Sequence, residues 1–420
     1  MVDLKRLRRV RRLDRAAGVV EVEAGLVGER FERWLEAQGL TLGHFPSSIL
    51  CSTVGGWVAA RSAGQCSSRY GKIEDMVVAL EVVTGDGVVR RTAAGGGFDW
   101  NAVFVGSEGT LGIITAATLR VHAQPVARAF RGWRMPSVAA GIEVMRRTMQ
   151  AGWRPAVVRL YDPLDTLLVG SKGSGSGGDG GHLGRLKALL AGEGTEAVKA
   201  RATRLALSVP GLVNRAVRAL PGPALLVTVC EGEAEEAAET DAAIAHFAEA
   251  AGGVDQGEGP GRRWMAHRYD VSYKQSKIYR SGAFVDTFEV ATTWSRVEAL
   301  YEAVRRAVGD EVLVMAHFSH VYPGGCSIYF TFVGTGRDRD EMRARYDRVW
   351  KAALDCAVAR GAAIAHHHGA GLSRRRHMPA THGEARRWFA ALKAVCDPVG
   401  IMNPGKLFAE EALDELGRSA

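Results

Sequence analysis

The sequence predicts an α+β protein, and three observations lead to this fold class. Residues 76–84 (MVVALEVVT) form a nearly continuous apolar strand, and a Gly-Asp-Gly turn leads into a returning VVRRT segment, which is the pattern of a β-hairpin. In residues 26–38, apolar side chains recur at helical spacing. In the later part of the chain, strands alternate with helices. An antiparallel sheet with helices on one face is the packing that buries such elements.

The expected elements can be placed in order along the chain. Besides the hairpin, the first 122 residues contain a strand at 18–23 (GVVEVE), the helix at 26–38 with Gly39 as its stop, and the strand candidate IITAATLRV. Later helices are expected at the ranges 137–150, 233–250, 294–307 and 339–360. The strands between them are expected in PAVVRLYD, LLVTVCEG, AFVDTFEV, VLVMAHFSHVY and CSIYFTFV.

These elements group into two domains. Residues 1–122 form a compact α+β unit, and residues 123–408 form a second domain with the antiparallel sheet. Within the second domain, residues 170–181 (GSKGSGSGGDGG) have the composition of a flexible loop. Residues 409–420 are a short tail.

Composition and charge restrict the functions that are possible. The net charge of +8 is scattered, since the Arg-rich helices also carry Glu and Asp, so no clustered footprint for nucleic acid is present. Small anionic substrates fit this charge equally well. The chain has no apolar run long enough for a membrane span and no apolar secretory signal at its start. The six cysteines contain no CxxC pair, which argues against a disulfide framework and favours a reducing, cytoplasmic location.

Three segments of the first domain combine glycines with short polar residues at strand edges. They are PSSILCSTVGGWVAARSAG (46–64), YGKIEDMV (70–77) and GSEGTLGIIT (106–115). Glycines let backbone N–H groups approach a ligand, and hydroxyls bond phosphate or ribose oxygens. Each segment alone is usually an ordinary connection, but three of them in one small unit favour a ligand site.

The stretch AHHHGAGLSRRRHMP (365–379) could be a metal site, a tag, a nucleic-acid patch or the edge of a catalytic pocket. An apolar GAAIA segment leads into it, so we expect a strand, on which adjacent side chains point to opposite faces. His366 and His368 would then share a face, His367 would point away, and no metal is expected because three adjacent ligands could not face one ion. Arg374–Arg376 would form a solvated helix start.

The motifs STVGGWVAARSAG, GKIEDMV and GSEGTLGIIT, followed by VVRLYD, HVYPGGCSIYFTF, AHHHGAG and GIMNPGKL, resemble in order and spacing the vanillyl-alcohol oxidase superfamily of flavoenzymes with the PCMH-type FAD-binding domain. The resemblance covers nearly the whole chain and is greatest to alkyldihydroxyacetonephosphate synthase and its bacterial relatives. It implies that residues 1–122 are part of an FAD-binding domain and that residues 123–408 are an FAD-linked oxidase C-terminal, or substrate, domain.

The resemblance also implies a cofactor, a reaction and a site. In the synthases, the flavin forms an adduct with a glycerone-phosphate-like substrate, an acyl group leaves and a fatty alcohol replaces it. By match of motifs, Tyr322 would be the acid/base, His366, His367 and His368 would assist, and Arg159 would hold phosphate or carboxylate. FAD contacts would involve the following residues: Ser47, Ser48, Ser52, Thr53, Ala60, Arg61, Ser62, Glu108, Gly109, Thr110, Gly112 and Ile114. A homodimer fits the family.

Some of these residues also have an ordinary structural interpretation without any catalytic role. Tyr322 could be a half-buried aromatic at a strand end, and Arg159 could simply pair with Asp162. His317 and His320 flank the same strand end as Tyr322 and are candidates for a supporting role at best.

The sequence departs from the family pattern in two places. It contains no PxxGGGTS pyrophosphate loop, so we expect that the lobe with this loop is missing from the chain. The arginine that would bind the substrate headgroup aligns with Gln275. Lys274, Lys277 and Arg280 are candidates to replace it, although a lysine does not reproduce the two-pronged contact of a guanidinium. Two alternatives to the synthase reaction therefore stay open: an FAD-linked oxidase or dehydrogenase of a 2-hydroxy acid such as D-lactate or glycolate, and an inactive remnant without flavin.

Overall fold

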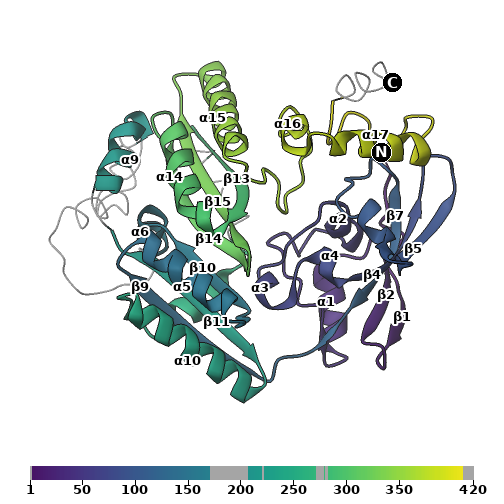
Figure 1. Ribbon diagram of the computed structural model, residues 1–420, viewed down its shortest axis with the longest axis horizontal. Helices are drawn as coiled ribbons and strands as arrows, with labels where there is room; N and C mark the ends of the chain where they lie inside the picture. The colour runs from purple at the N-terminus through teal and green to yellow at the C-terminus, as the bar shows by residue number, and fades with distance from the viewer. Residues whose placement is uncertain (1, 171–206, 220–221, 271–278, 280–281, 410–420) are drawn as a thin grey trace. The chain divides into compact units, whose positions relative to one another are not determined.

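The computed structural model describes residues 2–170, 207–219, 222–270, 279 and 282–409. It divides into two compact units, of which unit 1 combines residues 1–126 with 363–420 and unit 2 comprises residues 127–362 (Figure 1). The predicted loop at 170–181 lies outside the described residues from 171 onward. The functional domains predicted at 1–122 and 123–408 and the tail at 409–420 stay predictions.

Unit 1 is built on a six-stranded antiparallel sheet with the order β1-β2-β7-β4-β5-β6. The predicted strand at 18–23 is β2, the apolar strand at 76–84 is β4, and its hairpin partner is β5. The strands are β1 Val10–Asp14, β2 Val19–Glu23, β4 Val77–Val83, β5 Val89–Gly95, β6 Phe98–Asp99 and β7 Ile113–Arg120. A separate two-stranded ribbon joins β3 Leu40–Thr41 to β8 His122–Ala123.

Short helices cover the apolar side of this sheet. The predicted helix at 26–38 is α1, which buries Phe31 and Leu35 completely because they lie four residues apart on one helical face. Gly55 of α2 approaches Ala24 so closely that a Cβ at this position would lie 2.6 Å from the alanine methyl group. The helices of unit 1 are α1 Gly28–Glu36, α2 Val54–Ala59, α3 Ser67–Tyr70, α4 Ile73–Met76, η1 Trp100–Val103, α16 Met378–His382 and α17 Ala385–Cys396.

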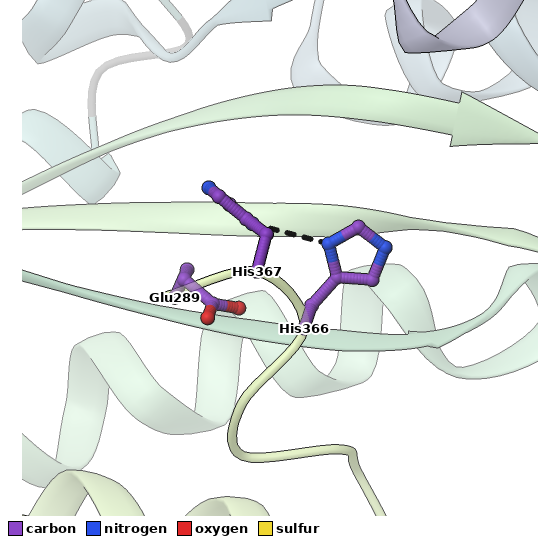
Figure 2. A group of neighbouring side chains, drawn as sticks. All are labelled: Glu289, His366 and His367. Carbon is purple, nitrogen blue, oxygen red and sulfur yellow. Dashed lines mark hydrogen bonds between the residues drawn. The ribbon is translucent and has the colours of Figure 1, made fainter. Parts of the chain in front are cut away.

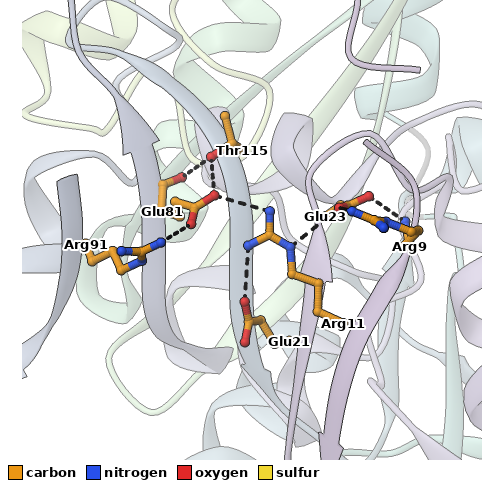
Figure 3. Close-up of polar contacts among 7 residues, drawn as sticks. All are labelled: Arg9, Arg11, Glu21, Glu23, Glu81, Arg91 and Thr115. Carbon is orange, nitrogen blue, oxygen red and sulfur yellow. Dashed lines mark hydrogen bonds and ion pairs between the residues drawn. The ribbon is translucent and has the colours of Figure 1, made fainter. Parts of the chain in front are cut away.

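The opposite side of the sheet carries a network of paired charges (Figure 3). Arg11 on β1 donates to Glu21 on β2 and to Glu81 on β4, each at 3.2 Å. Glu23, which is 1% exposed, accepts from Arg9. The bond from Arg9 lowers the pKa of Glu23, and the bond from Arg11 lowers the pKa of Glu81. These ion pairs connect β1 and β2 to β4, which lies on the other side of β7 in the same sheet.

Unit 2 is built on a seven-stranded antiparallel sheet with the order β12-β9-β11-β10-β14-β15-β13. Its long central strands explain the apolar runs in the later part of the sequence. The strands are β9 Ala127–Met135, β10 Val157–Tyr161, β11 Ala224–Gly232, β12 Val254–Asp255, β13 Ala283–Thr293, β14 Leu313–Tyr322 and β15 Gly325–Thr335.

The four long helices of unit 2 pack on one face of this sheet, as predicted. Gly141 in α5 allows close packing, since a Cβ at this position would lie 2.4 Å from the Leu160 side chain on β10. These helices are α5 Val138–Gln150, α10 Ala234–Ala250, α14 Val297–Val308 and α15 Arg339–Ala359, and shorter ones are α6 Pro163–Gly170, α9 Pro210–Ala219, α11 Gly259–His267 and η2 Trp294–Arg296. The predicted α+β class with an antiparallel sheet is confirmed.

One short helix, α11, lies on the other face of the sheet. Its Pro260 packs against Gly132 on β9, whereas the next residue of β9, Arg131, pairs with Asp241 on α10. Neighbouring residues of a strand point to opposite faces, so α10 and α11 lie on opposite sides. Among the described residues, none of the helices has the length and apolar character that a membrane span requires.

Candidate functional site

The face of the seven-stranded sheet that is turned away from the long helices carries polar side chains. Tyr161 on β10 pairs with His317 on β14, and His317 pairs with Tyr329 on β15. Cross-strand partners in an antiparallel pair point to the same face. Arg159 precedes Tyr161 by two residues and therefore lies on this face as well. We call this set, Arg159, Tyr161, His317 and Tyr329, the polar face.

A β-bulge at His320 adds Tyr322 to the polar face. Ser319 pairs with Ser327, but Val321 pairs with Cys326. β14 therefore contains one extra residue at this point, and the alternation of its side chains between the two faces shifts by one position. His320 adopts a left-handed backbone conformation with φ of 50°. After this extra residue, Tyr322 points to the same side as His317, whereas an unbroken strand would turn it to the opposite side. No local pattern in the sequence predicts this bulge.

Arg159 is held within the polar face by contacts on several sides. Its Nη2 donates to Nε2 of His317 in a short hydrogen bond. The guanidinium carbon lies 5.3 Å from the centre of the Tyr161 ring, a cation–π distance. The His317 ring stacks on Tyr329 with 4.7 Å between ring centres. Nδ1 of His317 lies 3.5 Å from Oδ2 of Asp165 on α6.

The expected alternative, in which Arg159 pairs with Asp162, is wrong. Asp162 points to the helix side of the sheet, because it follows Tyr161 directly. There its carboxylate accepts from Tyr301 at 3.1 Å and from the Ala316 backbone at 3.0 Å. Arg159 instead bonds His317, one of the two histidines that were predicted to have at most a supporting role.

Burial raises the pKa of both carboxyl groups in this region. It raises the pKa of Asp165 to about 7, against the opposing effect of Arg159. It raises the pKa of Asp162 to about 6, against the opposing effect of Arg305. Strongly perturbed acids are common at functional sites, because enzymes use them near neutral pH.

The three adjacent histidines do not form the expected strand. Residues 366–368 follow a bent backbone in unit 1. His366 Nδ1 lies 3.1 Å from His367 Nδ1 (Figure 2). The ring centres of His367 and His368 are 4.2 Å apart. Glu289, also drawn in Figure 2, belongs to β13 of unit 2. The expectation that His367 points away from His366 is therefore wrong, and the argument against a metal that depended on strand alternation no longer applies.

The turn after the histidines has a physical reason to leave the strand conformation. The Glu108 carboxylate accepts backbone N–H groups from Ala370 at 2.5 Å and Gly371 at 2.9 Å. Gly369 and Gly371 have φ values of 74° and 53°, which glycine adopts without strain. The buried Arg374 then donates to the Gly369 carbonyl at 2.8 Å, so the expectation that this arginine is solvated is also wrong.

The predicted cofactor residues lie in loops of unit 1 and differ in exposure. Ser47, Ser48 and Arg61 are exposed, and Ser62, Thr110, Gly112 and Ile114 are buried. The half-buried ones are Ser52, Thr53, Ala60, Glu108 and Gly109. Gly112 is explained by packing alone, because a Cβ there would lie 2.7 Å from Val82. The contacts of these twelve residues with a cofactor stay predictions. The substrate roles of Gln275 and Arg280 also stay predictions, because both residues lie outside the described part of the chain.

His44 is a further candidate that sequence reasoning missed. Its Nε2 lies 3.0 Å from the Ser62 hydroxyl, and its ring lies 4.8 Å from that of Trp57. The side chain is fully buried, which lowers its pKa to about 3 and keeps the ring neutral. Nδ1 has no hydrogen-bond partner within the described part of the chain. The available signal was the position of this histidine directly before the predicted loop at Ser47.

Comparison with family models decides the class of protein. The model described as "FAD linked oxidases, C-terminal domain" matches residues 124–407, and the model "FAD binding domain" matches residues 1–93. The chain belongs to the FAD-linked oxidases. The predicted membership in this family is thus confirmed, and so is FAD as its cofactor.

Individual relatives agree with the family match. The chain is 29% identical to the alkyldihydroxyacetonephosphate synthase of Trypanosoma brucei brucei over 97% of its length, and it spans 64% of the length of that protein. It is 27% identical to an uncharacterised FAD-linked oxidoreductase of Escherichia coli strain K12, with 93% of this chain and 75% of the relative covered. A solved structure of alkyldihydroxyacetonephosphate synthase superposes with a TM-score of 0.70 at 25% identity, covering 96% of this chain and 67% of that one.

The residues of unit 1 fit FAD chemically. The exposed hydroxyls of Ser47 and Ser48 can bond ribityl or phosphate oxygens. The buried Nδ1 of His44, which has no partner among the described residues, is a polar atom that a ligand in this region would satisfy.

Proposed function

We propose that this chain is part of an FAD-dependent enzyme that exchanges an acyl for an alkyl group on a glycerone-phosphate-like substrate. The observation that carries the proposal is the polar face of unit 2, where Arg159 and Tyr322 lie on one side of the same sheet. The identity to a synthase of this name over 97% of the chain supports the choice of reaction.

Each residue of the polar face has a role that follows from its chemistry. The Arg159 guanidinium presents fixed N–H donors that match the oxygens of a phosphate or carboxylate. Its Nε is buried and has no hydrogen-bond partner among the described residues, which leaves a donor for such a group. The Tyr322 hydroxyl can hold or release a proton on the substrate, once a nearby cation favours the phenolate.

The cofactor and the histidines complete the proposal. When bound, FAD supplies a flavin ring that can react with the substrate carbon from which the acyl group leaves. The loops at 47–53, 60–63 and 108–114 would hold it. His366, His367 and His368 would assist proton transfer, as the resemblance to the synthases implies.

Product analysis tests this proposal directly. The purified protein would be supplied with FAD, acyl-dihydroxyacetone phosphate and a labelled fatty alcohol. We expect label in an ether product, one equivalent of free fatty acid, and no net electron transfer. An absence of ether product from protein that has bound FAD would exclude the exchange reaction.

A second candidate is oxidation of a 2-hydroxy acid such as D-lactate or glycolate. The similarity to an FAD-linked oxidoreductase favours it, and Arg159 would bind a carboxylate as well as a phosphate. Substrate-dependent reduction of a dye identifies this reaction. A protein fraction whose visible spectrum has no flavin bands, after FAD is added and the unbound FAD is removed by gel filtration, would exclude both candidates and favour the inactive remnant.

A further inference from the structure

Three side chains of unit 2 form a continuous line from a buried carboxylate to the polar face. Asp165 on α6 lies beside His317 on β14, and His317 contacts Arg159 on β10. The side chains of Asp165 and His317 are 14% and 10% exposed. We call these residues the Asp-His-Arg line.

Hydrogen-bond chemistry fixes the tautomer of the central histidine. A guanidinium has only donors, so Nε2 of His317 must accept the bond from Arg159. A neutral imidazole that accepts at one nitrogen carries its proton on the other. The proton of His317 therefore lies on Nδ1, the nitrogen that faces the Asp165 carboxylate at 3.5 Å.

We propose that Asp165 and His317 are positioning residues that aim Arg159 at an anionic group of the substrate. This inference rests on the proposed function, in which Arg159 binds phosphate or carboxylate. Asp165 holds the His317 tautomer whose Nε2 accepts from Arg159. The same bond occupies Nη2 of Arg159 and leaves its buried Nε as a donor for the ligand.

The surroundings of the line support an orienting role. The Tyr329 ring stacks on His317, and the Tyr161 ring lies against Arg159, so neither side chain can turn freely. Within the described part of the chain, the charged and titratable groups facing Asp165 are Arg159, Tyr161 and His317, with Asp162 directly before the same helix. Burial raises the pKa of Asp165 to about 7, so this carboxyl is mostly ionised at pH 8, the pH of the experiments below.

Replacing the carboxylate should disturb the line without removing its bulk. In Asp165→Asn, the side-chain amide can turn its NH2 group toward Nδ1 of His317. With the amide in this orientation, Nδ1 accepts and the imidazole proton lies on Nε2, where it opposes the N–H of Arg159. The arginine would lose its orientation, while its charge would stay in place.

Nitrogen NMR on the histidines measures the tautomer without any reaction. The full chain would be labelled with 15N-histidine and studied at pH 8, and the His317 signals would be assigned by their loss in His317→Gln. We expect a protonated Nδ1 and an unprotonated Nε2 in the wild type, and a change of this pattern in Asp165→Asn. A wild-type His317 with its proton on Nε2 would overturn the proposal.

Calorimetric titration with inorganic phosphate at pH 8 measures the consequence for binding. We expect Asp165→Asn to bind phosphate roughly tenfold more weakly than the wild type, with the matched exposed variant Asp310→Asn unchanged. If Asp165→Asn does not fold, two variants of His317 test the positioning role instead. His317→Gln, which keeps an acceptor for Arg159, should retain affinity, and His317→Phe should lose it.

These outcomes separate the inference from the proposed function. Unchanged phosphate affinity in folded Asp165→Asn or His317→Phe, or no phosphate binding by the wild type, would overturn the positioning role. A failure of the exchange reaction with the tautomer and phosphate results as expected would overturn only the choice of reaction.

Discussion

At the scale of single residues, the proposed roles of Tyr322 and Arg159 depend on the side chains around them. A tyrosine at a strand end and an arginine before an acidic turn are ordinary features of a sequence. In the structure, Arg159 bonds His317, whereas Asp162 bonds Tyr301. The two acids near Arg159, Asp162 and Asp165, therefore have separate environments.

Tyr322→Phe tests the proposed acid/base. We expect a loss of exchange rate of about 10²-fold or more, because proton transfer by a positioned group contributes this much. Phosphate affinity should stay near that of the wild type. Tyr279→Phe removes a hydroxyl from an exposed tyrosine and serves as the control. A Tyr322→Phe variant with normal turnover would exclude the role.

Asp165 should make stability depend on pH. Its pKa is about 7 in the folded chain, compared with an ordinary value of 3.8. Between these values the unfolded chain has released the proton that the folded chain keeps, so stability should fall as pH rises from about 4 to 7. We expect chemical denaturation to show a smaller decline in Asp165→Asn than in the wild type or Asp310→Asn. Equal slopes would contradict this assignment.

At the scale of elements, the bulge in β14 decides which side chains share a face. An unbroken strand would place Tyr322 among the core residues on the helix side. The cost is a left-handed backbone at His320, a conformation that is uncommon outside glycine, that asparagine, aspartate and histidine adopt more often than other residues, and that β-branched residues avoid.

Two substitutions at the bulge test this cost. His320→Asn should keep stability near that of the wild type, because asparagine tolerates this conformation. His320→Val should lower the free energy of unfolding by about 1–3 kcal/mol, because a β-branched side chain does not. Urea denaturation of both variants gives the comparison. Equal stability of the two would show that the backbone at this position is not strained.

The charge network on the sheet of unit 1 offers a second test at this scale. Removing Arg11 in Arg11→Ala should cost about 1 kcal/mol, since its pairs with Glu21 and Glu81 are partly shielded from solvent. Opposite charges lower the pKa of Glu23 and Glu81, so their contribution is present above the unfolded pKa and is lost as pH falls below about 4.5. Arg12→Ala, an exposed neighbour on β1, is the control in urea denaturation at pH 7 and pH 4.

At the scale of the whole molecule, unit 1 combines the first part of the chain with its last part. Lys393 on α17 donates to the Thr110 carbonyl at 2.8 Å, and Asn403 donates to the Glu108 carbonyl at 2.6 Å. These bonds fasten the predicted cofactor loop to the C-terminal segment. Loss of either stretch should therefore disturb the same loop.

Binding of FAD should stabilise the protein. A ligand at one hundred times its Kd adds about 2.7 kcal/mol to the stability of a folded state that binds it. We expect the unfolding temperature to rise with added FAD, measured by light scattering and circular dichroism. Adenosine diphosphate serves as a control for binding by the nucleotide part alone. An unchanged unfolding temperature at saturating FAD would contradict FAD binding by this chain.

The sequence by itself determined the long helices and most of the long strands, the sheet class and the family. Apolar periodicity depends on neighbouring residues, so the hairpin of β4 and β5 and the helices α5, α10, α14 and α15 could be predicted from local patterns. Ordered glycine motifs identified the flavin family for the same reason, since a close backbone approach requires glycine wherever it occurs.

Only the tertiary structure decided how the candidate residues pair. The bulge at His320, the capture of the 370–371 turn by Glu108, and the contact between His317 and Arg159 join residues that are distant in sequence. Local patterns cannot show such contacts. Arg159 and His317 are 158 positions apart and Glu108 and Gly371 are 263 positions apart, so each pair meets only once the strands and loops have folded together. For that reason the three histidines were predicted on a strand, although the carboxylate of Glu108 bends the chain that follows them.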